Sequence, residues 1–295
     1  MSQEILNFTT VKRMCDSIAI QSPYSTLTLR TYLLSLVRFT KLCGYPDLDA
    51  LVEEIRKGKL NPDDVYRSYA VKLTSCSLAP KSVITMLAGL KKFFTENDIE
   101  LKKRHRIKGF TIHESTLPSY EQLSDLLRIS DLRARTAILM LLSSGLRIGE
   151  LSRLRLGNIE LDVTPAGIYL SSKFTKSRRK RVTFISTEAQ ASLKAYLEKR
   201  KSRGHSINDD SPVIATRKGD PVTVWGLYEI VHRPMAQLSK KDPDGWYTLR
   251  PHILRKFFIT QMLLAGVPDA IVDAMVGHQS LAKEYGLFEV PRFMQ

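Results

Sequence analysis

Apolar residues recur at three- and four-residue intervals through the first hundred residues of the chain, which is the spacing of amphipathic helices. Gly44 and Pro46 end the first long segment, and the pair Asn61-Pro62 is a typical helix start. The predicted helices span residues 24–43, 48–55 and 61–73, and a further helix begins at Pro80 and carries its apolar face through Phe94. This pattern predicts a small, all-helical N-terminal domain.

From residue 119 onwards, helical spacing alternates with short runs typical of strands. Ser119 and Gln122 form a capping-box pattern at a helix start, and Thr187 with Gln190 repeats it. The segments GIYL and VTFI predict two strands, at residues 167–170 and 182–185. Further helices are predicted at residues 135–144, 187–201 and 225–238, followed by a helix from His252 to the Gly266 break and a short one ending at Gly277. The expected fold class is therefore mainly α with a small β-hairpin.

A basic stretch separates the two patterns. Residues 102–108 read KKRHRIK, and the polar segment GFTIHESTLPS follows. A charge run of this kind is either a solvated surface or a segment that follows a phosphate backbone. We predict a helical domain at residues 1–101, a basic linker at 102–118 and a second domain at 119–295.

The whole chain is strongly basic. It has 45 Lys and Arg against 30 Asp and Glu, a formal net charge of +15 and a pI near 9.7. Such an excess favours a polyanionic partner, of which nucleic acid is the commonest, although anionic lipid and solubility alone are alternatives. No apolar run is long enough to span a bilayer, and Cys15, Cys43 and Cys76 are too far apart to form a disulfide framework or a metal knuckle. We therefore expect a cytoplasmic protein with no membrane partner.

Cationic side chains are also concentrated between the predicted strands and near the C-terminal helices. Six of the eleven residues from 171 to 181, between the predicted strands, are Lys or Arg, so this hairpin tip must be solvated or lie on an anion. His252 and Arg255 stand three apart at a helix start, and His278 follows Gly277 at the end of the next helix. All three side chains can donate hydrogen bonds to a bound oxyanion.

The segment SGLRIGEL places a further arginine just after a glycine at a helix start. Arg147 is there well placed for an anion, and it is equally well placed for a structural salt bridge with Glu150, one turn on. CxxC, HExxH and acidic clusters are missing from the sequence, so we expect neither a metal nor another cofactor.

The order of these motifs resembles the tyrosine recombinase (phage integrase) family. The resemblance rests on the arginine of GLRIGEL, a lysine in a basic hairpin, HxxR, GH and a tyrosine near the C-terminus, and it covers about residues 115–288. It implies an N-terminal helical core-binding domain and an α+β catalytic domain. It also implies a catalytic set of Arg147, Lys173, His252, Arg255, His278 and Tyr285, supported by Glu150 and Lys176.

The resemblance assigns a role to each residue of this set. Arg147 and Arg255 would hold the non-bridging oxygens of the scissile phosphate, with Glu150 orienting the arginine side. His278 would hydrogen-bond the phosphate in the transition state, and His252 would do the same or accept a proton from the nucleophile.

Proton donation and attack fall to the remaining members. Lys173, or alternatively Lys176, would protonate the 5′-oxygen leaving group. Tyr285 would be the nucleophile of a 3′-phosphotyrosyl intermediate. It follows His278 by only seven residues, a shorter interval than in many family members. Phe288 stands near the position where a shifted alignment would place the tyrosine, so a substituted nucleophile is the alternative.

The activity implied is site-specific recombination or integration of DNA, without metal or ATP. Type IB topoisomerase-like relaxation and an inactive DNA-binding relative are the alternatives. The expected partners are double-stranded DNA and other copies of the chain, as a tetramer on two recombination sites, and accessory DNA-bending factors are compatible with both. The side chains expected to contact DNA phosphates are Lys102, Lys103, Arg104, Arg106, Arg178, Arg179 and Lys180.

Overall fold

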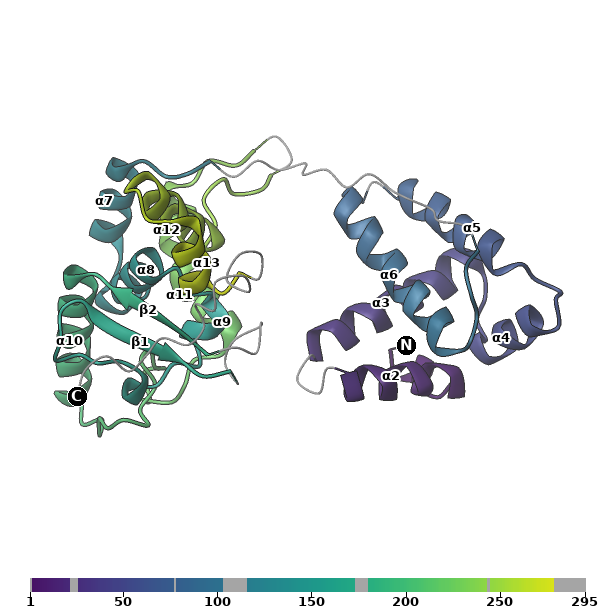
Figure 1. Cartoon of the computed structure of the whole chain (residues 1–295), viewed down its shortest axis with the longest axis horizontal. Helices are drawn as coiled ribbons and strands as arrows, with labels where there is room; N and C mark the ends of the chain where they lie inside the picture. Colours follow the sequence, from purple (N-terminus) through teal and green to yellow (C-terminus); the bar gives the residue numbers. More distant parts are fainter. Residues whose placement is uncertain are drawn as a thin grey trace. The chain divides into compact units, whose positions relative to one another are not determined.

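The structure is a computed structural model of the 295-residue chain, and it describes residues 2–21, 26–76, 78–102, 116–172, 180–242 and 245–278. The chain forms two compact units, residues 1–112 and 113–295, each of which is described by itself (Figure 1). The division falls inside the basic segment 102–118. The role of that segment as a linker stays a prediction, because most of it lies outside the described residues.

The first unit is helical, as the apolar spacing predicts. Side-chain caps by Asp47 and Asn61 begin two of the helices, and Pro62 stands in the first turn of the second. Its helices are α1 (Ser2–Ile5), α2 (Thr9–Gln21), α3 (Thr26–Cys43), α4 (Leu48–Arg56), α5 (Pro62–Thr74) and α6 (Pro80–Glu96). Their core is rich in aromatic rings, with Phe39, Tyr69 and Phe93 fully buried.

The second unit is built from helices and one β-hairpin. Before the hairpin come α7 (Tyr120–Ile129), α8 (Leu132–Ser144), α9 (Ile148–Leu151) and a 3₁₀ turn at Leu156–Asn158. The hairpin is β1 (Ala166–Leu170) and β2 (Arg181–Ile185), and α10 (Thr187–Lys201), α11 (Val224–Leu238), α12 (His252–Leu264) and α13 (Asp269–Val276) follow. The predicted fold class, mainly helical with a two-stranded hairpin, is confirmed.

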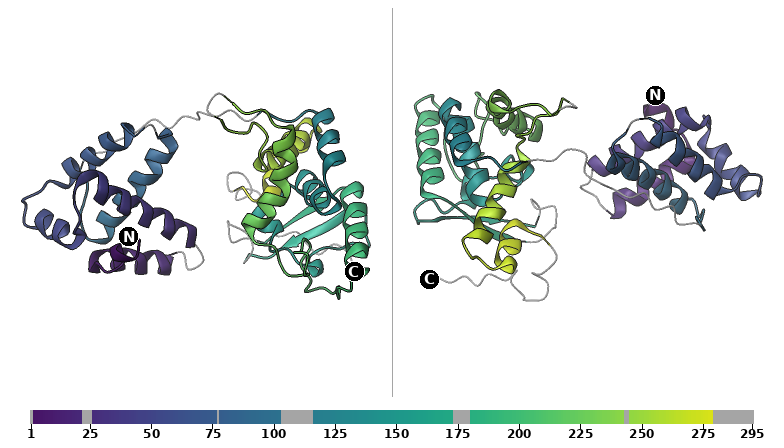
Figure 2. Two further views of the ribbon diagram at one scale, coloured as in Figure 1. Left: turned by 180° about the vertical axis from the view of Figure 1, so that it is seen from behind. Right: turned by 90° about the horizontal axis from the view of Figure 1, so that it is seen from above.

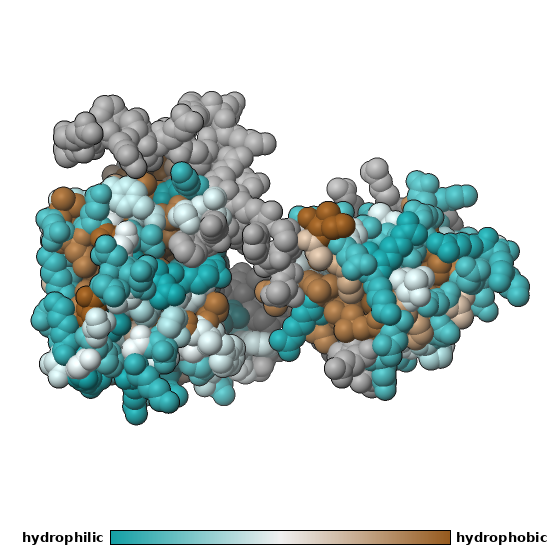
Figure 3. Space-filling view, turned by 90° about the horizontal axis from the view of Figure 1, so that it is seen from below, coloured by the Kyte–Doolittle hydropathy of each residue, from teal (hydrophilic) through white to brown (hydrophobic). Residues whose placement is uncertain are grey.

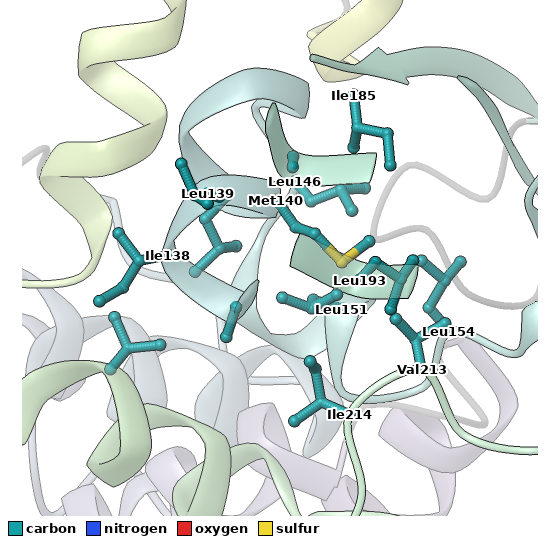
Figure 4. Close-up of a cluster of buried hydrophobic side chains, with 14 of the residues drawn as sticks. Ile138, Leu139, Met140, Leu146, Leu151, Leu154, Ile185, Leu193, Val213 and Ile214 are labelled. Carbon is teal, nitrogen blue, oxygen red and sulfur yellow. The ribbon is translucent and has the colours of Figure 1, made fainter. Parts of the chain in front are cut away.

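Helix α8 is the central element of this unit. It packs against α10, α12 and β2, and its buried residues from Ala137 to Leu141 leave no polar face. Figure 4 shows side chains of α8 meeting Leu151 of α9, Ile185 of β2 and Leu193 of α10 in one apolar cluster. The two further views in Figure 2 show α12 and α13 side by side. Burial of α8 therefore fixes the elements that carry the candidate site.

The predicted ends of the elements hold to within a few residues, with two corrections. The helix expected from residue 135 begins at Leu132, because the Asp131 side chain accepts a hydrogen bond from the Ala134 amide and caps it there. The predicted cap Thr187 is wrong. Ser186 is the N-cap residue, and its hydroxyl accepts from the Ala189 amide, so Thr187 is the first helical residue.

The hairpin strands pair antiparallel, with Ala166 opposite Ile185 and Leu170 opposite Arg181. Along β2 the residues Arg181, Thr183 and Ile185 are buried, whereas Phe184 is exposed. Since side chains alternate across a strand, Arg181 lies on the inward face of the hairpin. An arginine on that face needs buried partners.

Some apolar side chains remain at the surface of the first unit. Figure 3 shows a gathering of hydrophobic residues on one of its faces. The exposed apolar residues of this unit include Ile20, Leu27, Leu34 and Val71, the first two more than 70% exposed. Within the described part of the chain, none of the helices combines the length and the apolar character needed to cross a bilayer.

Candidate active site

Two helix ends meet at the centre of the site. Gly145 ends α8 with φ +63°, and Gly277 ends α13 with φ +71°, both in the left-handed region that favours glycine. Arg255, on the first turn of α12, donates from Nη1 to the Gly145 carbonyl and from Nη2 to the Val276 carbonyl at 2.6 Å. Arg255, 3% exposed as a residue, therefore joins the ends of two helices that are far apart in the sequence.

Arg147 is the N-cap residue of α9 and stands two residues after Gly145. Its Nη1 donates to Glu150 Oε1 at 3.1 Å and to the Val276 carbonyl at 3.4 Å, while its amide donates to Glu150 Oε2 at 2.7 Å. A salt bridge with Glu150 and a contact with an anion are thus both compatible with this geometry, because Arg147 forms the salt bridge and still leaves 29% of its side chain exposed. Arg147 and Arg255 share one carbonyl acceptor, so the two guanidiniums lie together.

A third arginine completes the cluster. Arg181 donates from Nη2 to Glu150 Oε2 at 2.5 Å and from Nη1 to the Met275 carbonyl. Its side chain and that of Glu150 are each 2% exposed. Arg147 and Arg181 thus both contact the Glu150 carboxylate, while Arg255 is held by backbone carbonyls. The last carbonyls of α13 accept from all three arginines, in keeping with the negative end of a helix dipole.

His278 lies two residues beyond Val276 in the sequence. Its Nδ1 lies 3.1 Å from Asp273 Oδ1, one turn back on α13. When the imidazole is neutral, this contact favours the tautomer with hydrogen on Nδ1, which leaves Nε2 available to another group. Asp273 therefore orients the ring at the edge of the arginine cluster.

His252 is the first residue of α12, one turn from Arg255. Desolvation by the surrounding protein, followed by the positive charges of Arg255 and Lys256, lowers the pKa of His252 from its ordinary value of 6.5. The residue remains exposed, so solvent weakens both effects. The direction of the shift favours a neutral imidazole at neutral pH, which can accept a proton.

Burial also acts on the arginines. Desolvation and the neighbouring charge of Arg147 lower the pKa of Arg255 to about 9, against the opposing effect of Glu150. Desolvation likewise lowers the pKa of Arg181. Because a guanidinium starts from a pKa above 12, both remain charged at pH 7. The positive charge of the cluster therefore lies in a partly buried environment, where its attraction for an anion is stronger than in water.

The predicted site residues divide into two groups. The structure brings Arg147, Glu150, His252, Arg255 and His278 into one region of the second unit. Lys102 and Lys180 are described and exposed. The predictions for Lys103, Arg104, Arg106, Lys173, Lys176, Arg178, Arg179 and Tyr285 fall outside the described residues.

Arg181 is the site residue that the sequence motifs did not single out. Its contacts come from α9 and α13, which no local pattern links to β2. One signal could have identified it. Arg181 shares the alternating inward face of its strand with Thr183 and Ile185, and a charged residue on such a face requires a buried partner.

Metal ligands do not gather in the described residues. Among residues 2–278, apart from the gaps in the description, three His, Cys, Asp or Glu side chains nowhere come together as a metal-binding group. The described donors at the site are instead cationic, and they suit an anion such as a phosphodiester.

Comparison with known proteins identifies the family. The model of the phage integrase family matches residues 116–284, more than half of the chain. The chain belongs to the phage integrase family. The integrase match contains the described arginine cluster and His278.

Similar tyrosine recombinases cover between 72% and 95% of the chain. Tyrosine recombinase XerC of Leptospira interrogans serogroup Icterohaemorrhagiae serovar copenhageni is 26% identical over 95% of this chain and 88% of its own length. Tyrosine recombinase XerC of Bacillus pumilus is 24% identical over 90% and 87%. Tyrosine recombinase XerA of Pyrococcus horikoshii is 25% identical over 72% and 71%.

Solved structures share the fold. The Tn1549 transposon integrase in complex with transposon right end DNA superimposes with a TM-score of 0.65 at 18% identity, over 97% of this chain and 96% of that one. The XerH site-specific recombinase bound to palindromic difH substrate gives 0.62 at 19% identity, over 90% and 77%. A lambda integrase dimer bound to a COC′ core site gives 0.63 at 17% identity, over 92% and 74%. These likenesses confirm the fold class.

Proposed function

We propose that this integrase-family chain is a site-specific DNA recombinase that cleaves and rejoins DNA strands through a 3′-phosphotyrosyl intermediate, without metal or ATP. One observation carries the proposal. Arg147 and Arg255 share the Val276 carbonyl, two residues before His278, and this supports a site in which one phosphate would contact all three side chains.

The arginines would hold the scissile phosphate by its non-bridging oxygens. A guanidinium fork matches two phosphate oxygens and cannot lose its charge at neutral pH. Arg255 is fixed by two backbone carbonyls and Arg147 by Glu150, so both are arranged before DNA binds. Preorganised donors of this kind stabilise the charge of a phosphorane-like transition state without reorganising during the reaction.

In the cleavage step, the Tyr285 hydroxyl would attack phosphorus. The Oη–P bond forms while the P–O5′ bond breaks, and the phenolic proton passes to His252, which its lowered pKa keeps neutral before the step. Lys173, or alternatively Lys176, would give a proton to the departing 5′-oxygen. Because the new ester keeps the energy of the old one, attack by a 5′-hydroxyl reverses the step and needs no ATP.

The proposed partners are double-stranded DNA and further copies of the chain, which places the protein where DNA is, in the cytoplasm. The net charge of +15 and the exposed Lys102 and Lys180 support phosphate contacts. The apolar face of the first unit supports association between copies, since exposed apolar patches commonly mark interaction sites. A tetramer on two sites is the assembly that strand exchange between two duplexes requires.

A suicide substrate tests the chemistry. A duplex nicked just 3′ of the cleavage point loses its short 5′-hydroxyl fragment after attack, so the protein–DNA adduct accumulates. We expect a covalent adduct with the wild type and none with Tyr285→Phe, and mass spectrometry of the adduct should locate the phosphotyrosine. A Tyr285→Phe adduct equal to that of the wild type would overturn the assignment of the nucleophile.

A second assay separates recombination from related activities. Strand exchange between two site-bearing duplexes identifies a recombinase, whereas relaxation of a supercoiled plasmid without exchange identifies a topoisomerase-like enzyme. DNA binding with no adduct identifies an inactive relative.

A further inference from the structure

We propose that Arg181 is a positioning residue of this site: it holds Glu150 in a salt bridge and so keeps that carboxylate from neutralising Arg147. The inference rests on the proposed cleavage of DNA by the same site. It concerns a residue outside the motifs that identify the family, and one that acts through Glu150.

Arg181 is buried, as Arg255 is, but it differs from Arg255 in donating to the Glu150 carboxylate. Its side chain is 2% exposed, and its Nε is fully buried without a hydrogen-bond partner. An arginine kept in this position, with one donor unsatisfied, carries an unfavourable desolvation cost. Its two remaining nitrogens both serve the site, since they contact Glu150 and the Met275 carbonyl.

The two carboxylate oxygens of Glu150 accept hydrogen bonds from different donors, and this explains the role of Arg181. Oε2 accepts from Arg181 Nη2 and from the Arg147 amide, and Oε1 accepts from Arg147 Nη1. Without Arg181, Arg147 would be the one arginine among the described residues still hydrogen-bonded to the buried carboxylate, and the attraction would draw that guanidinium inward. With Arg181 present, Arg147 keeps charge and surface available for an anion.

The second contact of Arg181 extends this effect to α13. The Met275 carbonyl, which accepts from Arg181, precedes the Val276 carbonyl that Arg147 and Arg255 share. Arg181 therefore ties β2 to the helix end that positions both of the other arginines. A lysine could replace its charge but not both directions of its planar fork.

The test compares Arg181→Lys and Arg181→Met with a matched control, Arg200→Lys. Arg200 is also a buried arginine of the second unit, 4% exposed, and it also donates to a backbone carbonyl and has a buried Nε without a partner. We expect both Arg181 variants to form adduct about 10- to 100-fold more slowly than the wild type, as for outer partners of reacting groups. The control should keep the wild-type rate.

Two modified substrates show how Arg181 acts. A methylphosphonate at the cleavage point removes the charge that the arginines neutralise, so the deficit of the Arg181 variants should shrink on it. A 5′-bridging phosphorothiolate removes the need to protonate the leaving group, so the deficit should persist on it. A merely structural role would leave the deficit equal on all three substrates.

A double substitution tests the link to Glu150 and protects the experiment against misfolding. If Arg181 acts by restraining Glu150, then Arg181→Met should cost much less in a Glu150→Gln background, where no buried carboxylate is left to attract Arg147. Equal costs in the two backgrounds, or rescue by the phosphorothiolate instead of the methylphosphonate, would overturn the inference.

A wild type that forms no adduct on any substrate would refute the proposed function. The role of Arg181 would then be tested by how much sulfate raises the thermal stability of each protein. We expect sulfate to raise the thermal stability of the wild type and of Arg200→Lys more than that of Arg181→Lys. The same rise in all three proteins would refute the role of Arg181.

Discussion

Replacing Gly145 by alanine tests how the end of α8 holds the site. An alanine Cβ at this position would meet Phe258 Cε1 at 2.8 Å and Val276 Cγ1 at 3.0 Å. Phe258 and Val276 are both buried in one small apolar cluster, so neither can easily move aside. Gly266, which follows α12 with a φ of +78°, is the matched control, because an alanine there would meet nothing within 4 Å.

The two variants separate backbone strain from crowding. Both place a Cβ in the left-handed region, at a cost of about 1 kcal/mol. Only Gly145→Ala adds overpacking, which costs about 1–3 kcal/mol. For a unit of this size, 1 kcal/mol lowers the Tm by about 2–4 °C. We therefore expect Gly266→Ala to lose about 2–4 °C and Gly145→Ala to lose roughly 4–16 °C.

Both tryptophans, Trp225 and Trp246, belong to the second unit, so tryptophan near-UV circular dichroism follows its unfolding alone. Below both transitions, Gly145→Ala should also form adduct on the order of 10- to 100-fold more slowly, because the Gly145 carbonyl orients Arg255. Equal losses of Tm in the two variants would refute the crowding at Phe258. A normal cleavage rate in Gly145→Ala would refute the role of its carbonyl.

Three further outcomes follow from the site. Arg147→Ala or Arg255→Ala should lower cleavage on the order of 10²–10³-fold or more while DNA binding stays largely intact, and wild-type cleavage in either would refute the clamp. Because the folded pKa of His252 is lowered, its contribution to stability is complete above the unfolded value of 6.5 and is lost as the pH falls through the folded value. Thermal scans of His252→Gln should accordingly depend less on pH below 6.5 than those of the wild type, and identical profiles would contradict the shift. Replacing Lys102 and Arg104 by glutamine should reduce the salt dependence of DNA binding by about one unit for each phosphate that is no longer neutralised, whereas an unchanged slope would place the linker away from DNA.

The sequence predicts the helices and strands of this fold well because capping residues and glycines stand at their ends. Asn61, Ser119 and the glycines at 145 and 277 act through local geometry, so the patterns around them identify helix ends without tertiary information. The wrong cap at Thr187 shows the limit. Two adjacent hydroxyl residues both suit an N-cap, and the entry of the chain from β2 favours Ser186.

The site is less predictable than the fold. The motifs identify Arg147, Arg255 and His278 because the resemblance supplies their order. The contacts that fix them are backbone carbonyls at 145, 275 and 276, whose directions depend on how α8 and α13 end in space. Arg181 was missed for the same reason, since its partners are separated from it by about 30 and 90 residues along the chain.

The short helix α13 has a consequence for how substrate and folding interact. Three like charges crowd its final turn, and they are restrained by the Glu150 carboxylate and by peptide oxygens. A phosphodiester lying among them would relieve that mutual repulsion and tighten the turn. On the proposed function, amide hydrogens near residues 273–278 should therefore exchange with solvent more slowly once DNA is bound, because the bound DNA would complete the ordering of the site.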